Sequence, residues 1–320
     1  MTHSLRSLFL GLSVVGLVLG ACVLAQGEAP AQTAASYTCP MHADVREAGP
    51  GRCPQCGMPL VLRGATPRGE YVLEVSTSRP VRATNRARAR LSVREPMTGA
   101  RVTRFEEIHE RLFHLFVISH DLKHFSHVHP TIRDDGSFEV DLVLPEAGGY
   151  QLLADFLPSG GFLQLAQKTV FTQGYDRGYS QVSRELAVDV GEKISNGTRV
   201  KLEVGEEQVA GRPGLISCRL EDADTGEALT DLEPYLGSWG HLVIVSADFA
   251  DVIHSHAITR VSRPAGSRIQ FIERFPRPGF YRMWAQFRRG GTVATASFTI
   301  EVGSAANQPV VRPFTLRPRD

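Results

Sequence analysis

The chain has 320 residues, with 35 lysines and arginines against 34 aspartates and glutamates, and it is 42% hydrophobic. These values are those of a folded protein long enough for two domains, and they exclude a disordered or collagen-like chain. A net charge of +1 excludes a broad basic surface for nucleic acid, and five cysteines are too few to staple such a chain with disulfides. The histidines and cysteines are clustered, however: six of the 11 histidines lie between residues 109 and 129, and three cysteines between residues 39 and 56.

Residues 1–21 have the pattern of a signal peptide. Arg6 provides a positive start, and the apolar run from Leu8 to Leu19 is too short for a membrane span of roughly 20 apolar residues. The sequence Leu19-Gly20-Ala21-Cys22 resembles the lipobox of bacterial lipoproteins, which implies lipidation of Cys22 and a membrane anchor. Ordinary cleavage after Ala25 is the alternative, and both predict an extracytoplasmic protein of the periplasm or cell envelope. Residues 22–36 have the composition of a linker.

Residues 37–62 contain two short pairs of metal-binding side chains. Cys39 and His42 form a Cys-x2-His pair, and Cys53 and Cys56 form a Cys-x2-Cys pair. Two such pairs on tight turns have the spacing of a tetrahedral metal site, and so short a segment needs a metal to organise it. The thioethers of Met41 and Met58 favour copper(I) or silver(I), whereas three thiolates and an imidazole also suit zinc. The alternative is a disulfide between Cys53 and Cys56, which would leave Cys39 unpaired.

This segment resembles the small heavy-metal-binding domain that accompanies copper and silver efflux proteins and copper-transporting ATPases. The resemblance rests on the pattern Y-x-C-P-M-H…G-x-C-P-x-C-G-M-x-L, which is matched at every fixed position from Tyr37 to Leu60. It implies a bound metal ion, with copper first and zinc or silver as alternatives, and a metal-efflux component as a partner.

The rest of the chain contains two copies of one sequence repeat. Three histidines return after 127 residues: His114, His127 and His129 as His241, His254 and His256. Gly148 and Tyr150 return after 131 residues as Gly279 and Tyr281, which indicates a four-residue insertion in the second copy. We therefore predict tandem domains at residues 69–174 and 182–303, followed by a flexible tail at 304–320.

Each copy has the sequence pattern of a β-sandwich. Short segments rich in β-branched and aromatic residues alternate with turn sequences such as Asp134-Asp135-Gly136. The strands expected in the first copy are Tyr71–Val75, Ala89–Val93, His114–Ile118, Phe138–Leu144 and Tyr150–Phe156. Five to seven short strands in about 105 residues indicate an antiparallel sandwich of immunoglobulin type. The predicted fold class is mainly β, with a small metal-bound knuckle module and two tandem immunoglobulin-like β-sandwich domains.

A hairpin would bring three histidines of each copy together. If residues 114–119 pair with residues 126–132, His114 lies across from His129, and period-two geometry places His127 on the same face. Neutral imidazoles bind copper(II), zinc or nickel, so we predict a metal site at His114, His127 and His129. The second copy predicts the same site at His241, His254 and His256. The alternative is that His114 and His241 are buried structural histidines bonded to backbone carbonyls.

The remaining candidates have weaker patterns. His120 and His124 are expected in the turn, as solvated loop residues. His109 precedes the strand and is expected either to complete a site or to lie on the surface. Cys218 lies in a strand pattern and is predicted to be a core residue, because no histidine or methionine follows it at the spacing of a blue-copper site.

The combination of modules resembles a family of exported bacterial proteins that join the small heavy-metal domain to β-sandwich repeats. The motifs are H-L-x-V-x-S-x-D-L…H-x-H-P and, in the second copy, P-Y-L-G-x-x-G-H, which stands here at Pro234–His241. The second copy departs from the first at Ala257, where the first has Pro130, and at Asp251, where the first has His124. The resemblance implies metal handling outside the cytoplasm and no assigned reaction.

Sequence signatures of catalysis are missing. The chain has no G-x-S-x-G, no H-E-x-x-H and no glycine-rich phosphate loop, so we predict no catalytic residue and no enzyme. The predicted function is capture or buffering of metal, most readily copper, or its delivery to an efflux partner. The alternatives are a structural or protein-interaction module of the envelope with a zinc-stabilised knuckle and, more weakly, an oxidoreductase with histidine-bound copper.

Overall fold

The computed structural model describes residues 37–38, 45–49, 51–54, 60–62, 70–177, 186–205, 208–258 and 267–304. The predicted signal peptide, Cys22, the linker and residues 305–320 lie outside these ranges, as do five candidate ligands: Cys39, Met41, His42, Cys56 and Met58. Within the described ranges all the regular structure is β-strand, which confirms the mainly β fold class. Those ranges contain no helix with the length and apolar character to cross a membrane.

The cysteine module contributes a small antiparallel sheet with the order β2-β1-β3. Its strands are β1 (Tyr37–Thr38), β2 (Arg46–Glu47) and β3 (Val61–Leu62). Among the described residues of the module, Cys53 is buried and packs in a cluster with Val45 and Leu60. The cluster continues into Ile108 and Leu157 of the first repeat, so this part of the module shares an apolar core with its neighbour.

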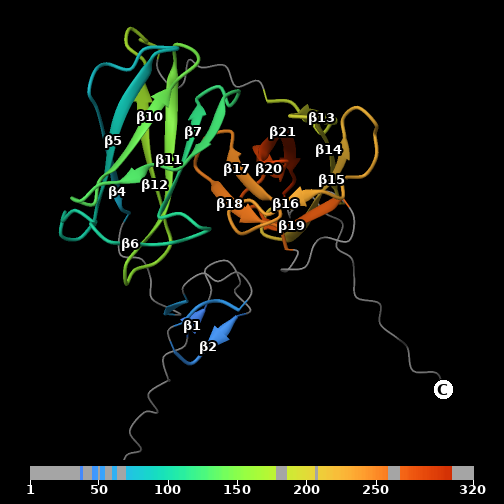
Figure 1. Ribbon diagram of the computed structural model, residues 1–320, viewed down its shortest axis with the longest axis horizontal. Coiled ribbons are helices and arrows are strands. Elements are labelled where there is room, and N and C mark those ends of the chain that lie inside the picture. Colours follow the sequence, from blue (N-terminus) through green and yellow to red (C-terminus); the bar gives the residue numbers. More distant parts are fainter. Residues whose placement is uncertain are drawn as a thin grey trace, which may run out of the picture. The chain divides into compact units, whose positions relative to one another are not determined.

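The first repeat is a sandwich of two antiparallel sheets, with the orders β4-β5-β10-β9 and β12-β11-β7-β8 (Figure 1). The strands of the first sheet are β4 (Val72–Thr77), β5 (Arg86–Arg94), β9 (Thr131–Ile132) and β10 (Phe138–Val143). Those of the second are β7 (Phe113–Ser119), β8 (Phe125–Val128), β11 (Gly149–Pro158) and β12 (Gln164–Phe171), with β6 (Phe105–Glu106) pairing to β11. On β5 the buried residues Ala87 to Val93 alternate with exposed arginines, because only one face of this sheet meets the core.

The second repeat has the same plan. One sheet has the order β13-β14-β15-β19, and the other has the order β16-β20-β17-β18 with β21 pairing to β20. The strands of the first sheet are β13 (Lys193–Ser195), β14 (Thr198–Val204), β15 (Pro213–Asp222) and β19 (Arg268–Arg274). Those of the second are β16 (Leu232–Glu233), β17 (His241–Ser246), β18 (Val252–His256), β20 (Gly279–Arg289) and β21 (Thr292–Val302). Cys218 is fully buried in the core between the sheets, as the sequence pattern predicts.

Both repeats share a tyrosine that fixes the entry to the long central strand. The hydroxyl of Tyr150 donates to the carbonyl of Glu146 at 2.9 Å, and that of Tyr281 donates to the carbonyl of Arg277 at 2.9 Å. A tyrosine bonded back to the backbone a few residues upstream is a feature of immunoglobulin-type sandwiches. The presence of this hydrogen bond in both repeats therefore agrees with the predicted sandwich type.

The strands that carry His114 and His241 are buried on both faces. Every residue of β7 and of β17 is buried, whereas an outer strand such as β5 alternates. One face of β7 packs into its own sandwich through Leu115 and Val117. The other face, with Phe116 and Ile118, packs against the second repeat. His114 is on that second face because it is two residues before Phe116.

An apolar cluster joins the two repeats. It contains Phe116, Ile118, Leu122 and Leu153 of the first repeat and Val243, Val245, Phe249 and Trp284 of the second. Phe125 stacks on Trp284 with ring centroids 4.8 Å apart. The faces that carry the histidines are thus held together by apolar packing.

This packing predicts that Trp284→Ala lowers the free energy of unfolding by about 3 kcal/mol, because the side chain is buried and leaves a cavity between the repeats. Denaturant unfolding of the two proteins measures the change. The matched control is Ile272→Ala, at a side chain that is 54% exposed on β19, which should cost less than about 1 kcal/mol. Equal effects of the two substitutions would show that the apolar contact does not form in solution.

Candidate metal centre

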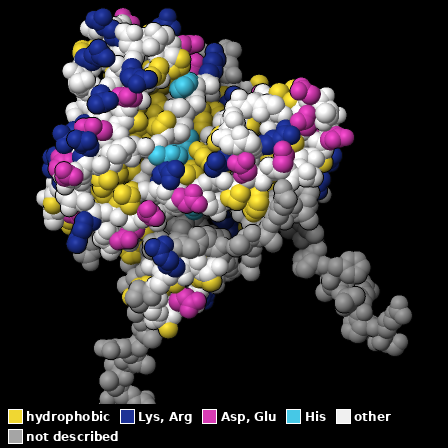
Figure 2. Space-filling view, viewed as in Figure 1, with side chains coloured by type: hydrophobic (Ala, Val, Ile, Leu, Met, Phe, Trp, Pro, Cys, Tyr) yellow, Lys and Arg dark blue, Asp and Glu magenta, His cyan; other side chains and the backbone are white. Residues whose placement is uncertain are grey.

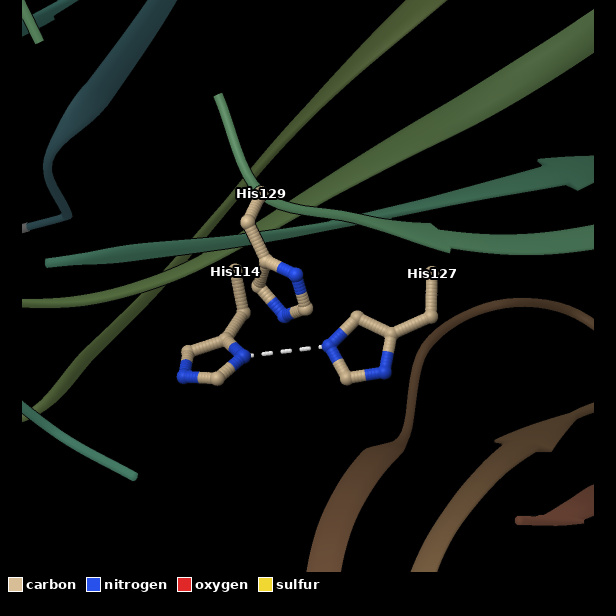
Figure 3. Close-up of side chains that lie close together, drawn as sticks. All are labelled: His114, His127 and His129. Carbon is tan, nitrogen blue, oxygen red and sulfur yellow. Dashed lines mark hydrogen bonds between the residues drawn. The ribbon is translucent and has the colours of Figure 1, made fainter. Parts of the chain in front are cut away.

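Three histidines of the first repeat converge on one point. His114 lies on β7, His127 on β8 and His129 just after β8. The pairing of Phe116 with His127 across these strands gives the register that the hairpin model predicts. One ring nitrogen of each histidine lies within 4.8 Å of the others, and Figure 3 shows the three rings turned toward one another. We refer to these residues as the first triad.

The second repeat repeats the arrangement. His241 on β17 pairs with His256 on β18, and Val243 pairs with His254, so that all three rings lie on one face of the sheet. One ring nitrogen of each lies within 4.8 Å of the others. We refer to His241, His254 and His256 as the second triad. The structure therefore brings together all six histidines of the predicted sandwich sites.

The outward hydrogen bonds of the first triad fix its tautomers. The Nε2–H of His114 donates to the carbonyl of Ile108 at 2.9 Å. The Nδ1–H of His127 donates to Oε1 of Gln286 at 2.8 Å, and Gln286 is oriented because its own amide group donates to Thr295. A neutral imidazole carries one proton, so the remaining nitrogens, His114 Nδ1 and His127 Nε2, present lone pairs. These two atoms face each other at 3.0 Å.

The second triad is oriented in the same way. The Nε2–H of His241 donates to the carbonyl of Tyr235 at 2.7 Å, and the Nδ1–H of His254 donates to Oδ2 of Asp155 at 2.6 Å. His241 Nδ1 and His254 Nε2 face each other at 3.3 Å. Two facing lone pairs repel unless a proton or a metal cation lies between them. Nitrogens bound tetrahedrally to one zinc ion lie about 3.3 Å apart, which these separations approach.

Burial favours the metal over the proton. It lowers the pKa of His114 from 6.5 to about 4 and that of His129 to about 3, chiefly because the charged imidazolium is poorly solvated there, with further lowering from neighbouring histidines. The pKa values of His127, His241 and His256 are lowered well below 6.5 for the same first reason. These five rings are therefore neutral at pH 7, the form in which histidine binds a metal.

Some triad nitrogens are buried without a hydrogen-bond partner. They are Nε2 of His129 and both ring nitrogens of His256. A buried polar atom without a partner costs about 1–3 kcal/mol, so such atoms need an explanation. A metal ion held by each triad would satisfy one nitrogen of each ring, and the residues present therefore fit a metal.

The two triads lie next to each other across the contact between the repeats. The ring of His254 lies 5.6 Å from that of His114 and 6.0 Å from that of His127, measured between centroids. His109 of the first repeat stacks on His256 at 3.6 Å and lies 5.9 Å from His241. Of the two expectations for His109, the position beside a site is the one observed. Figure 2 shows histidine at the surface only in small patches on the face drawn, in keeping with rings that are mostly buried.

The alternative interpretation of His114 and His241 holds for one nitrogen of each ring. Both side chains are fully buried, and both donate to a backbone carbonyl as a structural histidine would. Their second nitrogens point into the triads, however. The carbonyl bond orients each ring and leaves the other nitrogen as a donor to a metal.

The turn between β7 and β8 differs in part from expectation. The prediction that His120 is a solvated loop residue is wrong. Its side chain is 2% exposed, and its ring lies against Phe171 and Phe249. The turn is buried there because it meets the second repeat. His124 is half-buried and belongs to neither triad. Asp121 accepts from the hydroxyl of Ser119 and from the backbone N–H of Lys123, and so shapes the turn.

Two functional residues escape analysis of the sequence alone. Asp155 and Gln286 occupy equivalent places in the repeats, and each accepts a hydrogen bond from a histidine of the other repeat. Their equivalence is visible in the sequence, in Ala154-Asp155-Phe156 and Ala285-Gln286-Phe287. Their partners are not visible, because the contact joins residues about a hundred positions or more apart.

The fold and the site define a tandem β-sandwich protein with one histidine triad per repeat. A model described as a domain of unknown function (DUF8832) matches residues 68–174 and again 192–304. Because these matches cover more than half of the chain, the protein belongs to the DUF8832 family. A second model, described as a heavy metal binding domain, matches residues 36–61, the segment for which the sequence predicts one.

Comparisons with individual proteins add little. None of the curated proteins matches the chain significantly. Among solved structures, the chain is similar to red sea bream transglutaminase, with 9% identity over 74% of this chain and 32% of that one and a TM-score of 0.22. It is also similar to a two-domain fibronectin type III segment of chicken tenascin, with 11% identity over 72% of this chain and 98% of that one and a TM-score of 0.20. The chain thus spans about a third of the transglutaminase, and TM-scores this low bear on neither fold nor function.

The lowered pKa values predict that the metal-free protein loses stability as the pH falls from about 6.5 toward 4. Unfolded histidines take up protons near their ordinary pKa of 6.5, whereas His114 and His129 resist protonation in the folded state until about pH 4 and 3. The unfolded state then binds more protons, so acid favours unfolding in this window. Unfolding midpoints between pH 7.5 and 4.5 measure the slope. His129→Gln, which cannot be protonated, should flatten it; an unchanged slope would contradict the assignment.

Proposed function

We propose that this protein is an extracytoplasmic metal-binding protein that captures or buffers copper, or delivers it to an efflux partner. The observation that supports this most directly is the pair of ring nitrogens that face each other in each triad, 3.0 and 3.3 Å apart. Neutral, oriented imidazoles that already donate outward keep a lone pair on the other ring nitrogen, and that lone pair can bind a cation. The match of residues 36–61 to a heavy metal binding domain supports the same conclusion independently.

The chain offers two kinds of ligand, and we propose that they serve two forms of metal. The thiolates and thioethers predicted in the module are soft donors suited to copper(I) or silver(I), and also to zinc. The triads offer only imidazole, which suits copper(II) or zinc. Three imidazoles leave a fourth position of a tetrahedral ion open, as in sites whose metal meets a further ligand. An ion held in this way can be passed on.

We propose binding rather than catalysis. Asp155 is the carboxylate bonded to a triad histidine, and it is engaged as an acceptor from His254. Its geometry suits orientation of a ligand. The proposed location follows from the signal peptide pattern, and the proposed anchor is a lipid on Cys22, which would keep the protein at the membrane in which an efflux partner lies.

The proposal predicts three metal ions per chain, one in the module and one in each triad. Titration of the mature protein with copper(II) and with zinc, followed by native mass spectrometry, measures the stoichiometry. The double variant His129→Ala, His256→Ala should lose the two triad ions, because each triad keeps only two imidazoles. His124→Ala removes a histidine outside both triads and should keep all three.

The module is tested separately with copper(I). Cys53→Ser with Cys56→Ser should abolish one site, because two thiolates are lost, and should leave the triad ions in place. Competition with a copper(I) chelator measures the loss. If neither the module nor the triads bind any of these ions more tightly than micromolar, the proposed function is wrong. If His129→Ala and His256→Ala lower stability and leave the metal count unchanged, the histidines are packing residues and the structural alternative is correct.

A further inference from the structure

The two triads consist of equivalent histidines, but the acceptors that orient them differ. In each, the middle histidine donates from Nδ1 to an acceptor in the other repeat. For His127 this acceptor is the amide oxygen of Gln286, and for His254 it is the carboxylate of Asp155. The acceptors stand at equivalent places, since Asp155 pairs with His114 on β7 and Gln286 pairs with His241 on β17. The duplication has therefore placed a charge behind one triad and a neutral dipole behind the other.

Both acceptors are buried, which increases the effect of this difference. Asp155 is 4% exposed and Gln286 is 5% exposed. The side chains of His254 and Asp155 are each only 6% exposed, so water screens their interaction weakly. The hydrogen bond to the carboxylate is also the shorter of the two, at 2.6 Å against 2.8 Å.

The surroundings of the two triads differ at a second place. His109 lies in the turn before the first triad, at a left-handed φ of 49°, and Leu236 occupies the equivalent turn with a φ of 51°. From that turn His109 reaches the second triad and stacks on His256. The second triad thus has a carboxylate and a stacked imidazole of the first repeat beside it, whereas Leu236 at the equivalent place has an apolar side chain.

We propose that the second triad is the tighter metal site and fills first, with Asp155 as a positioning residue supplied by the other repeat. This rests on the proposed function. A carboxylate that accepts from Nδ1–H makes Nε2 of the same ring a stronger donor, and its negative charge offsets the charge of a buried cation. Gln286 orients His127 without either electrostatic effect. Partners of this kind change metal affinity by about 10–100-fold, so the two sites should differ on that scale.

The test isolates each site in the full mature chain, with Cys53→Ser and Cys56→Ser removing competition from the module. His129→Ala leaves the second triad intact, and His256→Ala leaves the first. Zinc chloride is the probe, and competition with a chelator gives the affinity. We expect the second triad to bind zinc at least about 10-fold more tightly than the first.

Two isosteric substitutions then separate charge from shape. Asp155→Asn keeps an acceptor oxygen and removes the charge. It should lower the affinity of the second triad about 10-fold or more and change the first triad less, because there the Asp155 charge acts on His114 without a side-chain hydrogen bond. Gln286→Glu adds the charge behind the first triad and should raise its affinity. In a protein that carries both Asp155→Asn and Gln286→Glu and keeps all six triad histidines, the first triad should fill before the second. Cobalt(II), whose visible bands report the donors, should show the shift caused by Asp155→Asn at the second triad alone.

The outcomes are distinguishable. Equal zinc affinities of the two isolated triads, or an equal loss at both triads with Asp155→Asn, would overturn the inference and leave the proposed function intact. A fall in the unfolding midpoint of Asp155→Asn with no change in zinc affinity or cobalt bands would assign Asp155 a structural role only, which also overturns it. Failure of both isolated triads to bind zinc overturns the inference, and the proposed function falls with it only if the module of the unsubstituted chain binds none of the ions either.

Discussion

The structure depends on the direction in which four of the six triad histidines donate a ring N–H. The N–H groups of His114 and His241 are committed to backbone carbonyls, and those of His127 and His254 to side chains of the opposite repeat. With the protons directed outward, the lone pairs must face inward. The geometry inside each triad is therefore a consequence of four acceptors that lie outside it, and removing an acceptor would release a ring to turn.

This arrangement requires the two repeats to be in contact. A histidine face on a lone sandwich would be hydrated, its rings would have pKa values near 6.5, and water would compete for every ring nitrogen. The apolar cluster around Phe116, Val243 and Trp284 closes the histidine faces against each other. Burial is tolerated because the outward nitrogens find partners, and it lowers the affinity of the inward ones for protons. The same desolvation that makes the rings poor bases in acid keeps them available to a metal at neutral pH.

Much of this could be predicted from the sequence. The repetition of His114, His127 and His129 after 127 residues gives two hairpins with a common register, and period-two geometry gives the shared face. The contact between the repeats could not be predicted, because β7 and β17 have continuous apolar patterns that fit either a buried helix segment or a strand covered on both faces. Without that contact, Asp155 and Gln286 are ordinary strand residues, and His120 is a loop residue open to water. The burial of His120 against Phe249, a residue of the other repeat, has the same cause.

Duplication preserved the ligands and changed what surrounds them. Beyond the pair Asp155 and Gln286, the turns after β7 and β17 have diverged: the place of His124 is taken by Asp251, which accepts from the side chain of Arg277. That ion-paired network stabilises the second-repeat turn without involving its triad. A single sandwich has one environment for its histidines, whereas two sandwiches in contact can each adjust the other's, since every middle histidine is held from across the contact. Two sites with the same ligands and different outer charge can hold metal over a wider range of concentration than two identical sites, which is the property that a buffer requires.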